Sequence, residues 1–396
     1  MRFIEETWSS EKLGNLCKIT MGQSPSSKNY SKNSNDTILI QGNADLISGK
    51  IVPRIYTSEI TKLSYPGDII LTVRAPVGDL AINEFDSCIG RGVCSIKGNK
   101  FIYYYLESLK DKHVWERLSQ GSTFESVNSN DIKNLNLKIP SNSTQNHIIN
   151  FFTAIDTKIE LLQKKHGEYI RFKQYLMQNI FADKSAEKLR FNFDDEWKQY
   201  KLKDVLTVKS SSISINQLEE NTGDYPLYGA SGFLKNIDFC EMDVDYISIV
   251  KDGSGVGNLS FHEKNSSIVN TSQYLLPKKN FNINFLYYLL QTINLMKYVN
   301  GSSIPHIYFK DYCIEKINIP SLDEQEKIGK LFVDVDITME NLNKNINATQ
   351  EFKKGLLQQM FVVRINWRCN FKLVKSPSFN KHLLILKNKI IFIIIK

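Results

Sequence analysis

Cysteine is scarce in this sequence and long hydrophobic runs are missing. The 6 cysteines among 396 residues include no C-x-x-C pair, the spacing typical of zinc and thiol redox motifs, so we expect scattered buried thiols. The longest obvious apolar run, residues 390–395, has six residues, whereas a membrane-spanning helix needs about 20. The acidic amino terminus lacks the apolar segment of a secretory signal. We therefore expect a cytoplasmic protein without a membrane association.

Motifs for catalysis and for nucleotide binding are missing too. The sequence has no G-x-x-x-x-G-K-[ST] loop, no H-E-x-x-H and no Pro-Pro pair, and hence no Asn-Pro-Pro-aromatic motif of DNA amino-methyltransferases. Its 6 histidines are scattered singly, and no spacing joins a nucleophile to a base. The glycine cluster 253–257 is better explained as a turn between strands than as a phosphate cradle. We expect no catalysis, metal or cofactor in this chain.

An excess of positive charge occurs only at the carboxy terminus. The net charge is +8, and residues 362–396 contain eight Lys or Arg and no Asp or Glu. Residues 1–361 are therefore balanced, with 42 basic and 42 acidic side chains. Total charge gives no support for nucleic-acid binding, although a local basic patch would still bind phosphates. We interpret segment 362–396 as an extension acquired by a change of reading frame, with a basic arm as the alternative.

The strongest pattern in the sequence is an internal repeat. Residues 121–181 are similar to residues 301–361 at a constant offset of 180. A repeat this long indicates a duplicated domain, because solenoid repeats have periods of about 20–50 residues. Identical pairs include Gly121 and Gly301, Pro140 and Pro320, Gln145 and Gln325, Asp156 and Asp336, and Phe181 and Phe361.

Upstream of residue 121 the offset between the two halves varies, as expected for related domains whose loops differ in length. Trp8 and Trp197 open the halves 189 residues apart. Segment 68–74 resembles segment 245–251, an alignment that pairs the last residues of the two segments, Arg74 and Lys251.

Each half predicts an α+β fold with the same order of elements. Short β-type runs broken by Gly, Pro, Asn and Ser come first. A short amphipathic helix follows, expected over residues 101–118 and 285–298, and then a short strand that ends in Ile-Pro. A long helix closes each half, with Ser143 and Ser321 as plausible caps.

The long helices carry the heptad pattern of a coiled coil, because their apolar residues recur at alternating spacings of four and three. Both patterns weaken at equivalent places, including Lys173 and Lys353. Packing of each stripe against its own domain is the alternative explanation. Residues 148–180 would form a helix of about 48 Å, the length of about fourteen base pairs. The seam residues are Ile148, Phe152, Ile155, Ile159, Leu162, Leu176, Ile180, Ile328, Phe332, Val335, Met339, Leu342, Ile346, Leu356 and Met360.

This layout resembles the specificity subunit of type I restriction–modification enzymes over residues 1–361. The resemblance is carried by the opening tryptophans, the Val-Arg-Ala-Pro-Val-Gly segment 73–78, the Gly-Ser-Thr and Gly-Ser-Ser turns, the Ile-Pro pairs and the endings 176–181 and 356–361. It implies two target-recognition domains that each read one part of a split DNA sequence. It also implies that the two long helices pack antiparallel and that their seam region docks two modification subunits.

The resemblance implies a division into recognition domains 1–142 and 184–320 and spacer helices 143–183 and 321–361, whereas the atypical tail 362–396 departs from the family. It further implies that the chain itself is non-catalytic. Adenine methylation would belong to the modification subunits and restriction to further subunits. S-adenosylmethionine, ATP and magnesium would bind to those partners.

Candidate DNA contacts follow from residue chemistry, since Arg suits guanine, Asn and Gln suit adenine, and Ser, Thr and Lys suit phosphates. Residues 184–320 contain one arginine, Arg190, so we expect the second half-site to depend less on guanine contacts. A solvated loop side chain is the alternative for each candidate. The candidates are Gln23, Ser24, Arg74, Arg91, Gln120, Ser122 and Thr123 in the first domain and Lys251, Asn270, Gln273, Ser302 and Ser303 in the second.

Three other functions compete with this interpretation. The chain would be a non-catalytic two-domain scaffold for protein or sugar ligands, an enzyme with an unrecognised site, or the inert product of a damaged gene. Copurification with a methyltransferase subunit would separate the specificity subunit from all three.

Overall fold

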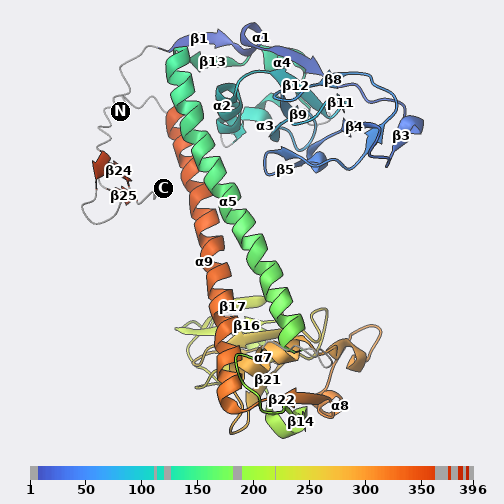
Figure 1. Ribbon diagram of the computed structural model, residues 1–396, viewed down its shortest axis with the longest axis vertical. Coiled ribbons are helices and arrows are strands. Elements are labelled where there is room, and N and C mark those ends of the chain that lie inside the picture. The colour runs from blue at the N-terminus through green and yellow to red at the C-terminus, as the bar shows by residue number, and fades with distance from the viewer. Residues whose placement is uncertain are drawn as a thin grey trace. The chain divides into compact units, whose positions relative to one another are not determined.

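The computed structural model describes residues 8–110, 114–119, 126–181, 190–218 and 220–361, together with three short strands near the carboxy terminus. The chain divides into two compact units, one made of residues 1–161 and 346–396 and the other of residues 162–345. Each unit contains one β-rich domain and opposite ends of two long helices (Figure 1). The carboxy-terminal strands, paired antiparallel in chain order, are β23 (Leu373–Lys375), β24 (His382–Leu386) and β25 (Lys389–Ile391).

The first domain is built from short strands in two main sheets. The strands are β1 (Ser9–Lys12), β2 (Lys18–Met21), β3 (Tyr30–Ser31), β4 (Thr37–Ile40), β5 (Leu46–Ile47), β6 (Lys50–Ile51), β7 (Tyr56–Thr57), β8 (Leu63–Ser64), β9 (Ile69–Thr72), β10 (Leu80–Ile82), β11 (Ser87–Ile89), β12 (Val93–Lys97) and β13 (Asn136–Ile139). One sheet has the order β2-β12-β9-β10-β6-β5 and the other β3-β7-β4-β11-β8, while β1 pairs with β13.

Helix α2 connects these sheets to the long helices. Its residues Phe101 and Leu106 are fully buried, and the Phe101 ring meets the rings of Trp8 and Phe361 with centroids 6.1 and 5.5 Å apart. The single helix expected over residues 101–118 is described in two pieces. The helices of this domain are α1 (Leu13–Leu16), α2 (Lys100–Lys110), α3 (Val114–Ser119) and α4 (Ser129–Lys133), with 3-10 turns η1 (Ser27–Asn29) and η2 (Asn43–Asp45).

The second domain repeats this plan with fewer strands. They are β14 (Lys198–Lys201), β15 (Leu206–Ser210), β16 (Tyr225–Gly229), β17 (Gly232–Ile237), β18 (Tyr246–Val250), β19 (Leu259–His262), β20 (Ser267–Ile268), β21 (Ser272–Pro277) and β22 (Lys316–Ile319). The sheets have the orders β15-β21-β18-β19 and β17-β16-β20, and β14 pairs with β22. As in the first domain, a four-residue helix, α6 (Leu202–Val205), follows the opening strand.

The prediction of one helix over residues 285–298 is wrong for the second half of that range. Helix α7 (Ile283–Gln291) ends earlier, and the Thr292 hydroxyl donates a hydrogen bond to the Leu289 carbonyl oxygen (2.7 Å). Threonine and asparagine side chains compete with the backbone for such bonds, which favours helix ends. The 3-10 turns η3 (Ile215–Leu218) and η4 (Leu295–Tyr298) and helix α8 (Phe309–Tyr312) complete this domain.

The two long helices are α5 (Asn142–Ile180) and α9 (Leu322–Phe361). They lie side by side and antiparallel within each unit (Figure 1), so the chain has the expected α+β fold with two tandem domains and an antiparallel helix pair. The Thr144 backbone N–H donates to Ser141 Oγ (3.4 Å), so Ser141 caps α5 and the expected cap, Ser143, is wrong. Ser321 directly precedes α9.

The seam residues predicted from the heptads face inward. All of them are buried except Leu162, Met339 and Met360, which are half-buried. In the first unit, Phe152 packs with Phe361 (6.5 Å between ring centroids), and in the second, Phe332 packs with Phe181 (5.7 Å).

Both units contain the same polar cluster, at the positions where a lysine interrupts the apolar heptad pattern. In the first unit, Lys353 Nζ lies 2.8 Å from Asp156 Oδ1, and the Tyr104 hydroxyl donates to Asp156 Oδ2 (2.8 Å). The second unit forms the same cluster from Lys173, Asp336 and Tyr288.

In the part of the chain that the structure describes, no helix is long and apolar enough to cross a membrane. Within the same residues, no group of three or more His, Cys, Asp or Glu is placed to hold a metal ion. Three of the free thiols are buried, those of Cys17, Cys88 and Cys94.

Candidate nucleic-acid interface

An open cleft of about 250 Å³ lies where several strands of the first domain end. The segments that form it follow β2, β4 and β9 and precede β12. Three residues predicted from the sequence as DNA contacts therefore meet in one place, although they are distant along the chain. The lining residues are Ser24, Gln41, Gly42, Asn43, Arg74, Ala75, Arg91 and Gly92.

Glycines allow these loops to approach one another. A Cβ atom on Gly22 would lie 2.1 Å from the Gly90 carbonyl oxygen, and one on Gly92 would lie 2.0 Å from the Gln41 carbonyl oxygen. Both distances are far below van der Waals contact, so only glycine fits at residues 22 and 92. The Gly90 N–H donates to the Ile40 carbonyl oxygen (2.8 Å) and joins the loops to the β4 end.

Two arginines give the cleft its chemistry. Arg74 and Arg91 are exposed, and no acceptor among the described residues pairs with either guanidinium. Ser24 Oγ accepts a hydrogen bond from the Arg91 backbone N–H (3.0 Å), so the serine positions the loop that carries Arg91. A guanidinium presents donors in a fork that suits a base edge or a phosphate.

A buried acid holds the loop that carries Gln41 and Gly42. Asp45 Oδ2 accepts from the backbone N–H of Gln41 (2.7 Å) and Gly42 (3.2 Å). Its second oxygen, Oδ1, accepts from Arg54 Nε (2.9 Å). The charge of Asp45 is therefore balanced by Arg54.

Sequence reasoning missed the amides of Gln41 and Asn43, which line the cleft. The available signal was a polar Gln-Gly-Asn segment directly after the apolar run 38–40. Gln23 is exposed beside Ser24 but does not line the cleft. The predicted contacts Gln120, Ser122 and Thr123 lie outside the described residues.

The candidates of the second domain also gather at strand ends. The Lys251 N–H, just after β18, donates to the Thr271 carbonyl oxygen (2.8 Å), next to the exposed Asn270. The Gly253 N–H donates to the Pro305 carbonyl oxygen (2.9 Å), in the loop that carries the exposed Ser302 and Ser303. Gln273 lies on β21, and its Nε2 donates to Ser210 Oγ on β15 (3.0 Å).

The glycine cluster 253–257 forms the expected turn between strands. Its last residue, Gly257, donates its N–H to the Val250 carbonyl oxygen (2.8 Å) and closes the connection from β18 to β19.

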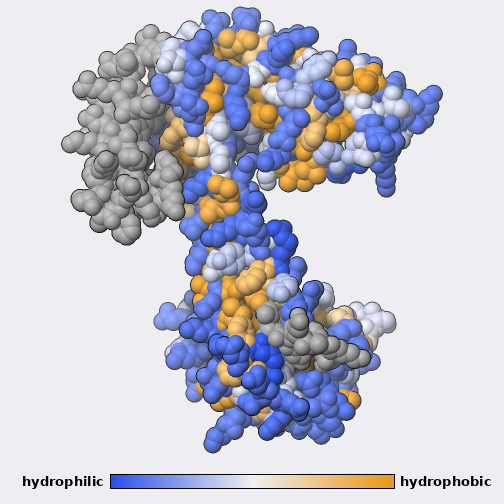
Figure 2. Space-filling model, in the orientation of Figure 1, coloured by the Kyte–Doolittle hydropathy of each residue, from blue (hydrophilic) through white to orange (hydrophobic). Residues whose placement is uncertain are grey.

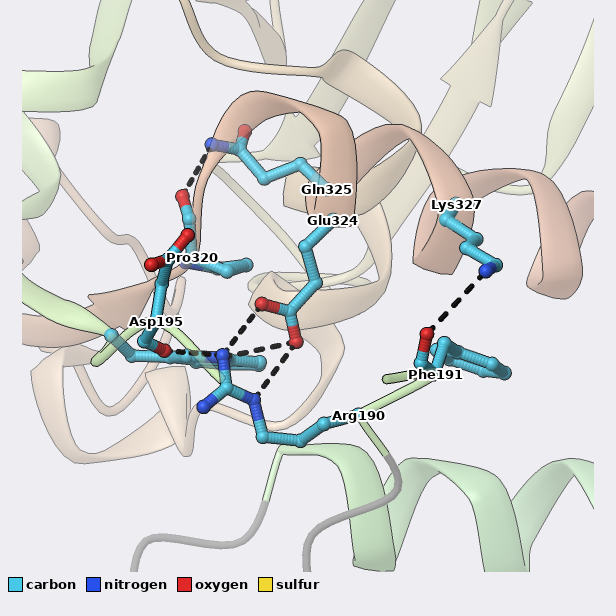
Figure 3. A network of polar contacts seen from close by, with 8 residues as sticks. Arg190, Phe191, Asp195, Pro320, Glu324, Gln325 and Lys327 are labelled. Atoms are coloured by element: carbon cyan, nitrogen blue, oxygen red, sulfur yellow. Dashed lines mark hydrogen bonds and ion pairs between the residues drawn. The ribbon is translucent and has the colours of Figure 1, made fainter. Parts of the chain in front are cut away.

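Arg190, the arginine that the sequence places in the second domain, is used at the start of α9 (Figure 3). Its Nε and Nη2 donate to the two oxygens of the fully buried Glu324 (3.1 and 2.8 Å), and the Trp197 indole donates to the same carboxylate (3.3 Å). The hydrogen bond to Glu324 raises the pKa of Arg190. This guanidinium therefore stabilises the helix start and is not free for DNA.

A family model described as "Type I restriction modification DNA specificity domain" matches residues 5–168 and 194–350. Among curated proteins, a putative type I restriction enzyme MjaX specificity subunit of Methanocaldococcus jannaschii is 36% identical over 191 residues. That match covers 46% of this chain and 44% of the relative, so this chain spans less than half of that protein's length in the alignment.

Two solved structures share the fold. The crystal structure of a type I restriction–modification S subunit from M. genitalium has a TM-score of 0.66 at 20% identity and covers 92% of this chain and 99% of that one. A structure described as concerning complex assembly and conformational transition of the type I restriction–modification system has a TM-score of 0.54 at 17% identity, over 91% and 98% of the two chains.

Proposed function

Because this chain belongs to the family of type I restriction–modification DNA specificity subunits, a family of non-catalytic proteins, we propose that it selects the DNA sequence on which such an enzyme acts. Each domain would read one half of a bipartite site in double-stranded DNA. The observation that carries the proposal is the duplication, because two similar domains expose polar strand ends and share one pair of long helices. Such a role would place the protein in the cytoplasm, with the DNA of the host.

The cleft of the first domain suits base reading. Arginine donates two hydrogen bonds to the O6 and N7 acceptors of guanine, while Asn and Gln pair with N6 and N7 of adenine. Arg74, Arg91, Gln41 and Asn43 bring both types of side chain to one cleft. The proposed contacts in the second domain are Lys251, Asn270, Gln273, Ser302 and Ser303.

We further propose that the outward faces of the long helices dock two modification subunits, with restriction subunits joining the full complex. The seam side chains are buried within the units, so they would support the docking surface and not contact a partner. Phe172, Tyr175 and Ile337 are 44, 52 and 50% exposed on the helices of the second unit, and such apolar surface is typical of interaction sites. Figure 2 shows hydrophobic patches on the long helices between hydrophilic residues.

In this arrangement the reaction chemistry belongs to the partners. The modification subunits would methylate adenine with S-adenosylmethionine, and the restriction subunits would use ATP and magnesium. This chain would contribute the DNA sequence preference alone.

The test is a single-molecule methylation map of DNA from cells that carry a modification subunit, with and without this chain. We expect a split motif methylated on adenine only when the chain is present. If no new motif forms, the map is repeated with the chain ended at Val362, which distinguishes interference by the tail from a wrong proposal. A scaffold for protein or sugar ligands would give no motif with either chain.

A further inference from the structure

Backbone hydrogen bonds at the strand ends show which residues of the two domains occupy equivalent positions. In the first domain the Val73 N–H donates to the Gly92 carbonyl oxygen (2.8 Å), and in the second the Lys251 N–H donates to the Thr271 carbonyl oxygen (2.8 Å). The carbonyl oxygen of each of these residues accepts from the next segment, from Val127 (3.0 Å) and from Ile307 (2.8 Å) respectively. Val73 and Lys251 therefore occupy the same position of the fold.

The next residue along the chain is Arg74 in the first domain and Asp252 in the second. Arg74 forms an antiparallel bridge with Ser126, and Asp252 forms the same bridge with His306. Ser126 and His306 are separated by the repeat offset of 180 residues. The sequence alignment that pairs Arg74 with Lys251 is therefore wrong by one residue. A one-residue slip reverses which face of a strand a side chain occupies, so this correction changes the chemistry of the position.

The same structural alignment of the two domains pairs Arg91 with Asn270. The residue before each of them, Gly90 or Val269, donates its N–H to the end of a neighbouring strand, at Ile40 (2.8 Å) or Tyr228 (3.0 Å). Residues 90 and 269 also accept matching turn hydrogen bonds from the first residues of β12 and β21. Both cleft arginines of the first domain thus have a non-basic counterpart in the second.

The exchange reverses the hydrogen-bonding character of the position. Arg74 offers only donors, whereas the Asp252 carboxylate offers only acceptors. The Asp252 side chain is 35% exposed, and its Oδ2 lies 3.6 Å from Lys251 Nζ. That distance is longer than a good charge-assisted hydrogen bond of about 2.7–2.9 Å, so the carboxylate keeps acceptor capacity.

We propose that Arg74 and Asp252 are the same base-reading position in two copies of one fold, and that they select guanine in the first half-site and cytosine in the second. Arg91 and Asn270 are the neighbouring reading position. This inference rests on the proposed function. Guanine presents two acceptors in the major groove and cytosine presents the N4 amino donor, which a carboxylate accepts.

The test uses the chain assembled with its modification subunit and the variants Arg74→Gln and Asp252→Asn, which remove the charge of each side chain. Affinity is measured for duplexes that carry the methylated motif with each base pair substituted in turn. We expect Arg74→Gln to abolish discrimination at one guanine of the first half-site, a loss of about ten- to a hundredfold in preference. Asp252→Asn should relax one cytosine of the second half-site, and each variant should leave the other half-site unchanged.

A matched control is Lys97→Gln, in the last residue of β12, whereas Arg91 precedes the first residue of that strand. This change should leave the preference at every base pair unchanged. Arg74→Lys keeps the charge but loses the two-pronged geometry, so it should also relax the guanine position. That variant decides the question if Arg74→Gln does not fold.

Three results would overturn the inference. A uniform loss of affinity for all duplexes, with a salt slope reduced by about one, would identify Arg74 as a phosphate contact. Unchanged discrimination in both variants would exclude the position from base reading, as would a change in the half-site that belongs to the other domain. Absence of any split motif with the unmodified chain would instead overturn the proposed function itself.

Discussion

A buried histidine makes the stability of the second domain sensitive to acid. His262 is 8% exposed, between the rings of Tyr228 and Tyr246, and its Nε2 lies 2.9 Å from Ser248 Oγ. Burial lowers the pKa of His262 to about 4 from the ordinary 6.5. The unfolded chain therefore binds a proton at a higher pH than the folded chain does.

The resulting stabilisation is fully present above pH 6.5 and is lost as the pH falls from 6.5 to 4. Its size is about 3 kcal/mol, from about 1.4 kcal/mol for each unit of pKa difference. We expect His262→Gln to flatten the pH dependence of the free energy of unfolding over this range, measured by urea denaturation at several pH values. The exposed His147→Gln serves as the control. Equal slopes in the unmodified chain and the His262→Gln chain would contradict the prediction.

At the scale of elements, the lysines that interrupt the heptads join the long helices through ion pairs. Lys353 on α9 is buried and lies 2.9 Å from Glu107 Oε2 on α2 and 2.8 Å from Asp156 Oδ1 on α5. Burial alone would lower the pKa of Lys353, but the two carboxylates reverse this effect and raise it. Lys173 is more exposed and pairs with one carboxylate, that of Asp336.

We expect Lys353→Met to destabilise the first unit by about 3 kcal/mol, because it removes the buried cation that pairs with both Asp156 and Glu107. Lys173→Met should cost less, about 1 kcal/mol, since water partly solvates the remaining acid. The measurement is the free energy of urea unfolding of each variant. Adding Asp156→Asn to Lys353→Met should recover part of the loss. The opposite order of the two lysine variants would contradict this account.

The long helices were predictable from sequence because their signal is local. A heptad pattern sets which residues face inward whatever the helix packs against, and the predicted residues from Ile148 to Met360 are buried or half-buried. The starting point of α5 was less accurate, because Ser141 and Ser143 are both suitable caps and the choice depends on the preceding strand.

The cleft was only partly predictable because its residues meet through long-range pairing. Arg74, Arg91 and Ser24 were selected by residue chemistry, but the place of Gln41 depends on the parallel pairing of β4 with β11. The counterpart of Arg74 was missed because residues 74–77 are replaced by the longer segment 252–256, and strand sequences of this length do not determine their own register.

At the scale of the whole molecule, equivalent contacts attach each domain to the long helices. Gln145 Nε2 donates to the Pro140 carbonyl oxygen (3.1 Å), and Gln325 Nε2 donates to the Pro320 carbonyl oxygen (3.0 Å). Trp8 packs on Phe101 of α2 and Trp197 packs on Phe285 of α7, with ring centroids 6.1 and 6.0 Å apart. The attachment is thus independent of the loops proposed to read DNA.

We therefore expect that the domains are interchangeable on the helices. A chain in which residues 8–141 are replaced by residues 197–321 should fold and, with the modification subunit, methylate a motif built from two copies of the second half-site. The reciprocal chain, with the first domain at both ends, should give two copies of the first half-site. A methylation map in which either chain keeps the original asymmetric motif would show that sequence preference does not belong to the exchanged residues.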